Sequence, residues 1–190
     1  MSSHYLSEPV PKFYYDQIKN GDDSLKNAVD NFWNNTLPHY FTQDKLFRIG
    51  LEQRPLEGAA VVKPRPDLTI RYIRNRASKK IVFVVLMANK RMGCENPPRP
   101  AEWEDYVEEL ADYLRLVRSE EEEEEEEEGD TDSILFGVVS IESYVRFYYL
   151  SCDRGFLDYP TTRTGGSYEL KEDEGEIHGI LTEYAINACQ

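Results

Sequence analysis

The stretch that decides the fold is KPRPDLTIRYIRNRASKKIVFVVLMANKR, residues 63–91. Two segments rich in apolar and β-branched residues flank a polar turn centred on Asn75 to Ser78, which predicts a pair of antiparallel strands. The second segment, KKIVFVVLMA, is apolar almost throughout, as in a central strand that is buried on both faces. With this turn, antiparallel pairing sets Asp67 opposite the residues from Leu86 to Lys90.

Helices and a second hairpin are predicted on either side of this stretch. Apolar residues recur at helical spacing between Leu25 and Trp33, between Trp103 and Val117, and between Ile177 and Ala188. The segment ILFGVVSIESYVRFYYLS, residues 134–151, predicts a β-hairpin that turns near Glu142 and Ser143. Such a mixture predicts an α/β or α+β domain with a mixed central sheet flanked by helices.

The length of 190 residues fits a single domain. We expect an N-terminal extension at residues 1–21 and one domain at residues 22–190. Glu120 to Glu128 are nine consecutive glutamates. Because like charges repel one another and stay solvated, this run predicts an acidic low-complexity loop at residues 119–132.

Several features bear on the cellular compartment. No run of about 18 apolar residues occurs, so no transmembrane span is predicted. The N-terminus lacks the basic and apolar regions of a secretory signal. Cys94, Cys152 and Cys189 have no metal-ligand spacing, which indicates reduced thiols. We therefore expect an intracellular protein, nuclear or cytoplasmic, that is not secreted.

Charge is segregated along the chain. The net charge is −14, and it becomes −5 when the nine glutamates of the run are subtracted. Residues 63–99 contain ten Lys and Arg but only Asp67 and Glu95, a local balance of +8. A basic segment of this kind fits a phosphate-bearing partner such as nucleic acid. Alternatively, it is a solvated hairpin face or a docking place for the protein's own acidic loop.

Five motifs follow one another in a recognisable order: RPDLTI, KKIVFVVLMANKR, WEDYVEELADYLRL, FGVVSIESYVRFYYL and EDEGEIHGILTEY. Over roughly residues 25–186, the chain resembles the PD-(D/E)xK nuclease-like domains abundant in filamentous fungi, which are relatives of the restriction endonucleases. The resemblance implies a core of four mixed strands flanked by helices. It also implies Mg²⁺-dependent cleavage of phosphodiester bonds wherever the site is intact.

The resemblance also suggests site residues. Asp67 would bind the metal, and Lys90 would help to place the nucleophile beside it. Asp44, Glu52 or Glu57 are candidates for a further metal ligand. Arg65, Arg71, Lys90 and Arg91 are the candidates for binding phosphate groups.

The sequence departs from the family pattern at one position. Counted back from Lys90, the acidic member of the motif falls on Ala88, which cannot bind a metal. Asn89 should face away, because side chains alternate along a strand. An acidic residue from the following helix, such as Glu104, Glu108 or Glu109, is a candidate to replace the missing metal ligand.

Two main hypotheses follow from this departure. The first is a catalytically impaired nuclease-like domain that binds nucleic acid or a protein partner. The second is an active Mg²⁺-dependent nuclease with a migrated acidic ligand. A structural protein with no relation to nucleases is a third reading, which needs a different core.

Overall fold

The structure is a computed structural model that describes residues 4–20, 25–51, 68–73, 79–88, 98–124, 134–151, 155–158 and 166–188. Its α-helices are α1 (Pro9–Asn20), α2 (Leu25–Thr36), α3 (Pro100–Glu124) and α4 (Glu174–Asn187). Short 3₁₀ helices are η1 (Tyr5–Ser7), η2 (Leu37–His39) and η3 (Gln43–Lys45). The strands are β1 (Phe47–Leu51), β2 (Leu68–Ile73), β3 (Lys79–Ala88), β4 (Leu135–Ile141), β5 (Tyr144–Ser151), β6 (Gly155–Asp158) and β7 (Tyr168–Glu169).

The strands form one mixed sheet in the order β1-β2-β3-β4-β5-β6, and β7 pairs with β5. The pair β3–β4 is parallel, whereas the other pairs are antiparallel. Parallel neighbours need a long crossover connection, and α3 provides it between β3 and β4. The predicted mixture of helices and strands is confirmed, and β3 lies inside the sheet as its apolar sequence indicated.

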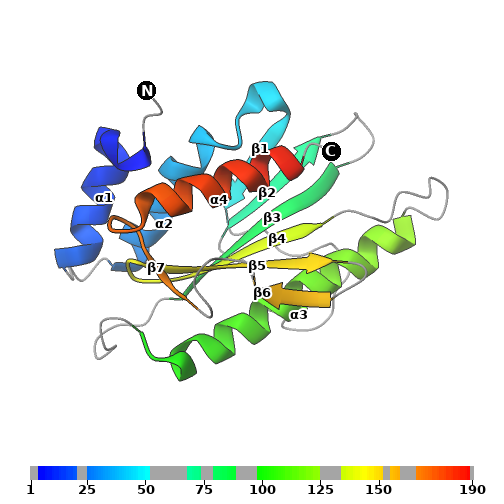
Figure 1. The fold of residues 1–190 in the computed structure, drawn as a ribbon. Coiled ribbons are helices and arrows are strands. Elements are labelled where there is room, and N and C mark those ends of the chain that lie inside the picture. Colours follow the sequence, from blue (N-terminus) through cyan, green and yellow to red (C-terminus); the bar gives the residue numbers. More distant parts are fainter. Residues whose placement is uncertain are drawn as a thin grey trace.

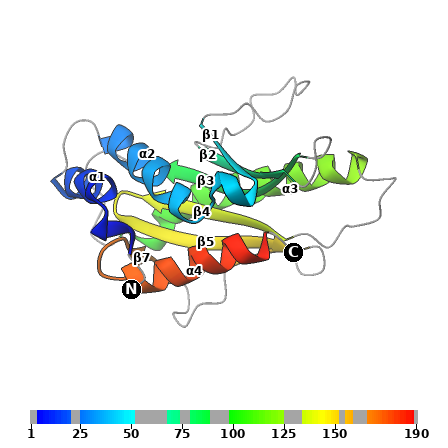
Figure 2. The same cartoon turned by 90° about the horizontal axis from the view of Figure 1, so that it is seen from above.

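Helices cover the two faces of the sheet unequally. α1, α2 and α4 lie on one face, and α3 lies along the other (Figures 1 and 2). The core on the first face includes Trp33 of α2, Phe136 of β4 and Tyr184 of α4. The core on the second face includes Leu114 of α3 and Val139 of β4. Residues 136 and 139 point to opposite faces because side chains alternate along a strand.

The predicted helices and hairpins agree with the structure. The helical segments correspond to α2, α3 and α4, of which α4 ends one residue before the predicted Ala188, and the turn of the second hairpin is at Glu142 and Ser143. β2 and β3 pair antiparallel around residues 74–78, which lie outside the described residues. The strands β1, β6 and β7 were not predicted, because each is shorter than six residues, too short for its pattern to be distinguished from a loop.

The predicted N-terminal extension is packed onto the domain. Residues 9–20 form α1, which was not predicted because Pro9 and Pro11 lie in its first turn. Proline is tolerated there, since the first helical N–H groups have no partner within the helix. Tyr5, Tyr15 and Ile18 are buried in the same core as α2 and α4.

Part of the predicted acidic loop is helical. α3 continues to Glu124, so residues 119–124 belong to the helix, while residues 125–133 lie outside the described part of the chain. Glutamate has a favourable helix propensity, and an existing helix grows without the cost of a new nucleus. These two effects outweigh charge repulsion at the start of the run.

Candidate functional site

Most residues predicted for the metal site lie outside the described part of the chain. They are Asp67, Lys90, Glu52 and Glu57, and the phosphate-binding candidates Arg65 and Arg91 also lie outside it. Arg71 is described on β2, and Ala88 is the last residue of β3. The roles of Asp67 and Lys90 therefore stay predictions.

The strands next to these residues pair in the predicted register. Leu68 is opposite Val85 across β2 and β3. Asp67, which was predicted to lie opposite the residues from Leu86 to Lys90, is outside the described residues, so this opposition stays a prediction. Ala88 is opposite Ile141 across the parallel strands β3 and β4. The carboxyl ends of β3 and β4 therefore meet at one end of the sheet, a common place for ligand sites in sheets with parallel strands.

A carboxylate pair at this end was not predicted from the sequence. Glu142 follows β4 in the turn to β5, with a φ of 53°, and Glu102 lies in the first turn of α3. Burial raises the pKa of Glu142, the negative charge of Glu102 raises it further, and Lys19 of α1 opposes the shift. Two carboxylates from separate elements are therefore close enough to repel each other.

Both carboxylates also have local structural roles or constraints. Glu102 accepts a hydrogen bond from the backbone N–H of Arg99 at 2.7 Å, which caps the start of α3. The positive φ of Glu142 is required by the tight turn between β4 and β5. A helix cap and a tight turn thus hold the pair in place.

An arginine stacks on a tryptophan beside Glu102. The guanidinium carbon of Arg146 on β5 is 4.4 Å from the centre of the Trp103 ring. Trp103 is buried, and Arg146 is half-buried. Such a contact contributes about 0.5–1 kcal/mol, and more when it is shielded from water. It ties β5 to the first turn of α3 and so helps to fix the position of Glu102.

The other acids considered as migrated ligands are less well placed. Asp44 of η3 and Glu104 and Glu108 of α3 are exposed, whereas Glu109 is half-buried. Among the described residues, no three His, Cys, Asp or Glu side chains are grouped so that they could hold a metal ion. Glu102 and Glu142 are therefore the better candidates for migrated acids.

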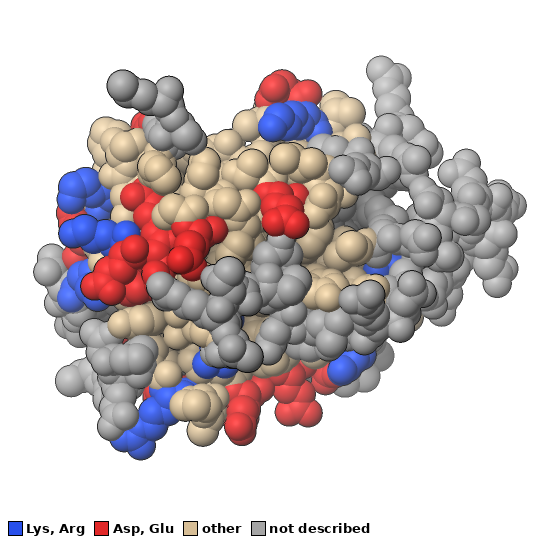
Figure 3. Space-filling model, viewed as in Figure 1, with Lys and Arg blue, Asp and Glu red and all other residues tan. Residues whose placement is uncertain are grey.

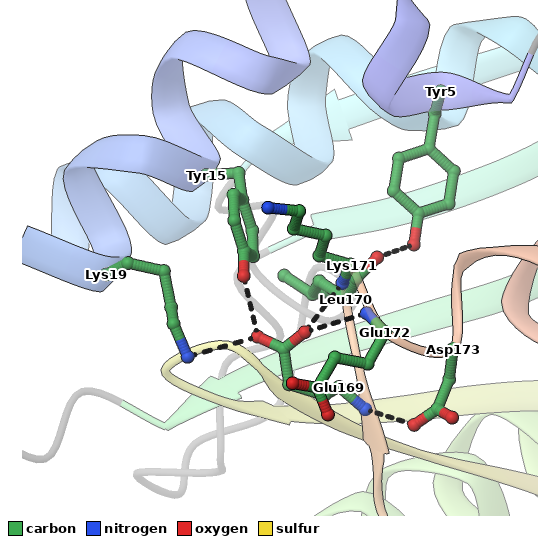
Figure 4. A network of polar contacts seen from close by, with 8 residues as sticks. All are labelled: Tyr5, Tyr15, Lys19, Glu169, Leu170, Lys171, Glu172 and Asp173. Carbon is green, nitrogen blue, oxygen red and sulfur yellow. Dashed lines mark hydrogen bonds and ion pairs between the residues drawn. The ribbon is translucent and has the colours of Figure 1, made fainter.

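A second polar cluster surrounds the buried carboxylate of Glu169 on β7 (Figure 4). One oxygen accepts a hydrogen bond from the Tyr15 hydroxyl at 3.0 Å and forms an ion pair with the Lys19 ammonium group at 3.3 Å. The other oxygen accepts the backbone N–H groups of Lys171 and Glu172, at 2.8 and 3.0 Å. The carboxylate is thus bound by donors from α1 and from the turn before α4.

The protonation of Glu169 reflects these donors. Burial alone would raise the pKa of its carboxyl group, but the N–H groups of Glu172 and Lys171 and the Tyr15 hydroxyl outweigh burial and lower it. The carboxylate is charged at neutral pH and is already fully engaged. We interpret this cluster as a clamp that joins the N-terminal helix to the C-terminal segment, not as a catalytic site.

Further contacts strengthen the same junction. The Tyr5 hydroxyl donates to the backbone carbonyl of Leu170, as Figure 4 shows, and the Leu6 N–H donates to the Glu174 carboxylate at 2.6 Å. Tyr40 of the segment after α2 forms a 2.9 Å hydrogen bond with His178 Nδ1 of α4. The N-terminal segment is therefore anchored to α4 and to the turn that precedes it.

Arg71, a predicted phosphate-binding residue, lies in an unusual setting on β2. It is directly opposite Arg48 of β1 in the antiparallel ladder. Its Nε atom is buried and has no hydrogen-bond partner. Like charges directly opposite one another destabilise a sheet unless an anion compensates them.

Comparisons of the chain with family models, curated proteins and solved structures gave no match. Within the described residues, no helix is long and apolar enough to cross a membrane.

The sequence holds only weak signals for the unpredicted groups. Glu102 lies three residues after Arg99, just after the prolines of the connector, which is the spacing of a helix cap. Glu142 lies at the tip of a predicted hairpin, where a polar residue is ordinary. Neither signal indicates that the two carboxylates influence each other, because their proximity depends on the crossover through α3.

Proposed function

We propose that this chain is a PD-(D/E)xK nuclease-like domain that binds nucleic acid through its basic β2–β3 hairpin and does not cut it. The fold supports this proposal. Strands β1 to β4 form a mixed sheet between α2 and α4 on one face and α3 on the other, in keeping with the core that the resemblance implies.

The observation that carries the proposal is Ala88, the last residue of β3. Mg²⁺ takes oxygen ligands, and nucleases hold it with one or two carboxylates plus the phosphate of the substrate. The methyl group of alanine offers no ligand. A domain that keeps the strands but has lost this carboxylate retains a surface for nucleic acid without the chemistry.

The excess of basic residues in one segment of the chain supports a polyanionic partner. Acidic side chains gather around α4 and the turn before it, where Glu172 and Glu176 are exposed (Figure 3). Lys and Arg side chains lie beside this acidic group in the same view (Figure 3), and exposed acids such as Glu104 and Glu108 also occur on α3. The basic residues 63–99 include Arg71 on β2, and phosphate contacts from such residues supply most of the sequence-independent affinity for nucleic acid.

Two assays on the full chain test the proposal. Fluorescence anisotropy measures the binding of labelled single- and double-stranded DNA and RNA. Gel analysis then follows the same nucleic acids with Mg²⁺, Mn²⁺ or EDTA. We expect binding that weakens with salt and no cleavage. Metal-dependent cleavage that Asp67→Ala abolishes would contradict the proposal, whereas cleavage gained by Ala88→Glu would support a lost site.

The carboxylate pair favours a second candidate, an active Mg²⁺-dependent nuclease. Glu102 and Glu142 lie at the end of the sheet where β3 ends, and carboxylate oxygens suit Mg²⁺. When bound, the ion would polarise a phosphate and activate a water molecule. In this case Glu142→Gln abolishes cleavage, whereas the control Glu183→Gln, on the exposed side of α4, does not.

A further inference from the structure

Two arginines lie side by side on one face of the sheet. Phe47 and Ile49 of β1 pack into the core under α2 and α4, so Arg48 between them points to the opposite face. On β2, Leu68 and Ile70 pack into the same core, so Thr69 and Arg71 also point away from it. Because Arg48 and Arg71 are direct partners in the ladder, we call them the Arg48–Arg71 pair.

The pair lies beyond the part of this face that α3 covers most closely. The main contacts of α3 with the sheet are to β3, β4 and β5. Arg48 is exposed, and Arg71 is half-buried. The basic pair therefore belongs to the edge of the sheet formed by β1 and β2.

This setting brings two positive charges together and leaves two buried polar atoms of the described residues without a hydrogen-bond partner. Directly opposed residues on one face have Cβ atoms only about 5 Å apart, so two arginines there repel each other. Arg71 Nε is buried and has no hydrogen-bond partner, and the same holds for the Thr69 hydroxyl two residues earlier. Buried polar groups without partners are rare in proteins, and a bound ion is one arrangement that satisfies them.

We infer that the Arg48–Arg71 pair is a binding site for phosphate groups of nucleic acid. Arginine offers a planar fork of N–H donors that matches phosphate oxygens, and two opposed forks can hold one anion between them. A bound phosphate replaces the repulsion between the arginines with two attractions. The inference deepens the proposed function and rests on it for the identity of the anion.

The first test measures nucleic-acid binding by anisotropy with a labelled 20-nucleotide strand. We expect Arg48→Gln and Arg71→Gln each to weaken binding about tenfold, and to reduce the slope of affinity against salt concentration by about one. Arg71→Lys, which keeps the charge but loses the fork, should fall in between. The matched control is Arg115→Gln on α3, which removes one exposed charge that is paired with Asp112 at 2.8 Å.

The second test uses inorganic tripolyphosphate and thermal unfolding, so that it does not depend on nucleic acid. We expect tripolyphosphate to raise the melting temperature of the wild type and of Arg115→Gln but not of Arg48→Gln. Arg48 is exposed on an edge strand, so its replacement should leave the fold intact even if Arg71→Gln unfolds.

The two tests separate the possible failures. Nucleic-acid binding that is equal in the wild type and in both arginine variants would overturn the inference and leave the proposed function standing. Arginine-dependent stabilisation by tripolyphosphate without nucleic-acid binding would keep the anion site and overturn the proposed function. Arginine-dependent binding of polyglutamate alone would identify an acidic protein as the partner and overturn both.

Discussion

The hydroxyl of Tyr15 on α1 donates a hydrogen bond to the carboxylate of Glu169 on β7, at 3.0 Å and across 154 positions of sequence. Lys19, one helical turn later, reaches the same oxygen. A single buried carboxylate thus fastens the first α-helix to the segment that leads into the last one. We therefore expect the attachment of the N-terminal segment to depend on the negative charge of Glu169.

Replacing Glu169 should weaken this clamp. Glu169→Gln keeps the shape but removes the charge that Tyr15, Lys19 and two backbone N–H groups share, so we expect the free energy of unfolding to fall by about 2 kcal/mol. Urea unfolding followed by circular dichroism measures the loss. The control Glu172→Gln removes a charge from an exposed side chain of the same turn and should change stability by less than about 0.5 kcal/mol. Equal losses in both variants would refute the clamp.

The same carboxylate predicts how stability depends on pH. The folded pKa of Glu169 is lower than its unfolded value, so the folded state binds this proton less readily than the unfolded state does. Its contribution is therefore present above about pH 5 and is lost as the pH falls through the folded pKa. We expect the difference in stability between wild type and Glu169→Gln to shrink steadily below pH 4. A difference that stays constant from pH 7 to pH 3 would contradict this.

The pKa of Glu142 is shifted in the opposite direction to that of Glu169. Burial and Glu102 raise its folded pKa, so its charged form destabilises the fold at neutral pH. Its φ of 53° is also unfavourable for a glutamate but tolerated by asparagine. We expect Glu142→Asn to raise the free energy of unfolding by about 1 kcal/mol at pH 7. The gain should be smaller at pH 4, where the wild-type carboxyl group becomes protonated.

Glu142→Gln separates the two effects in the same assay, because it removes the charge and keeps the strained turn. Its gain should be smaller than that of Glu142→Asn and should vanish at low pH. Destabilisation by both variants at pH 7 would show that Glu142 makes a favourable contact, as a metal ligand or otherwise.

The sequence predicted the elements whose patterns are long and regular. The spacing of Leu110, Leu114 and Val117 identified α3, and the apolar run of β3 indicated a strand inside the sheet. The helix α1 was missed because its two prolines conceal a buried face that includes Tyr15 and Ile18. That face is apparent only once the packing partners from α4 and β7 are known.

The candidate sites were less predictable for a related reason. Arg71 was predicted to bind phosphate because of its charge. Nothing in the sequence indicates that it lies opposite Arg48, since β1 was not predicted and the two residues are 23 positions apart. Glu102 comes near enough to Glu142 to affect its pKa only because α3 returns the chain to a strand parallel to β3. Local patterns predict elements, whereas these pairs depend on how the elements are connected.

The strand β4 carries a glycine where α3 approaches it most closely. A Cβ atom added at Gly137 would lie 2.8 Å from Cδ2 and 2.9 Å from Cδ1 of Leu110, which is itself fully buried. We expect Gly137→Ala to destabilise the protein by about 1–3 kcal/mol through overpacking. Adding Leu110→Ala should relieve the clash, so the two losses in the double variant should be less than additive.

Gly179 on α4 supplies the matched control for this substitution. It is exposed, and no atom lies within 4 Å of the position of its added Cβ. Alanine has a higher helix propensity than glycine, so Gly179→Ala should stabilise the protein by about 1 kcal/mol. Urea unfolding measures both effects on the free energy of unfolding. A loss for Gly137→Ala with a gain for Gly179→Ala would support close packing of α3 on β4, whereas a gain for both substitutions would refute it.

The C-terminal end of α3 is electrostatically unfavourable. The helix ends within the glutamate run, and its last turn contains no basic residue. Negative charge near a helix C-terminus opposes the helix dipole, at a cost of about 0.3–1 kcal/mol for each residue. Replacing Glu122, Glu123 and Glu124 together with glutamine should therefore raise helix content and raise the free energy of unfolding by about 1 kcal/mol. Because salt screens repulsion between like charges, the gain over wild type should be largest at 10 mM salt and small at 1 M. Circular dichroism during urea unfolding at both salt concentrations measures the free energies of unfolding. A gain in stability that does not depend on salt would mean that repulsion between the glutamates does not destabilise the helix.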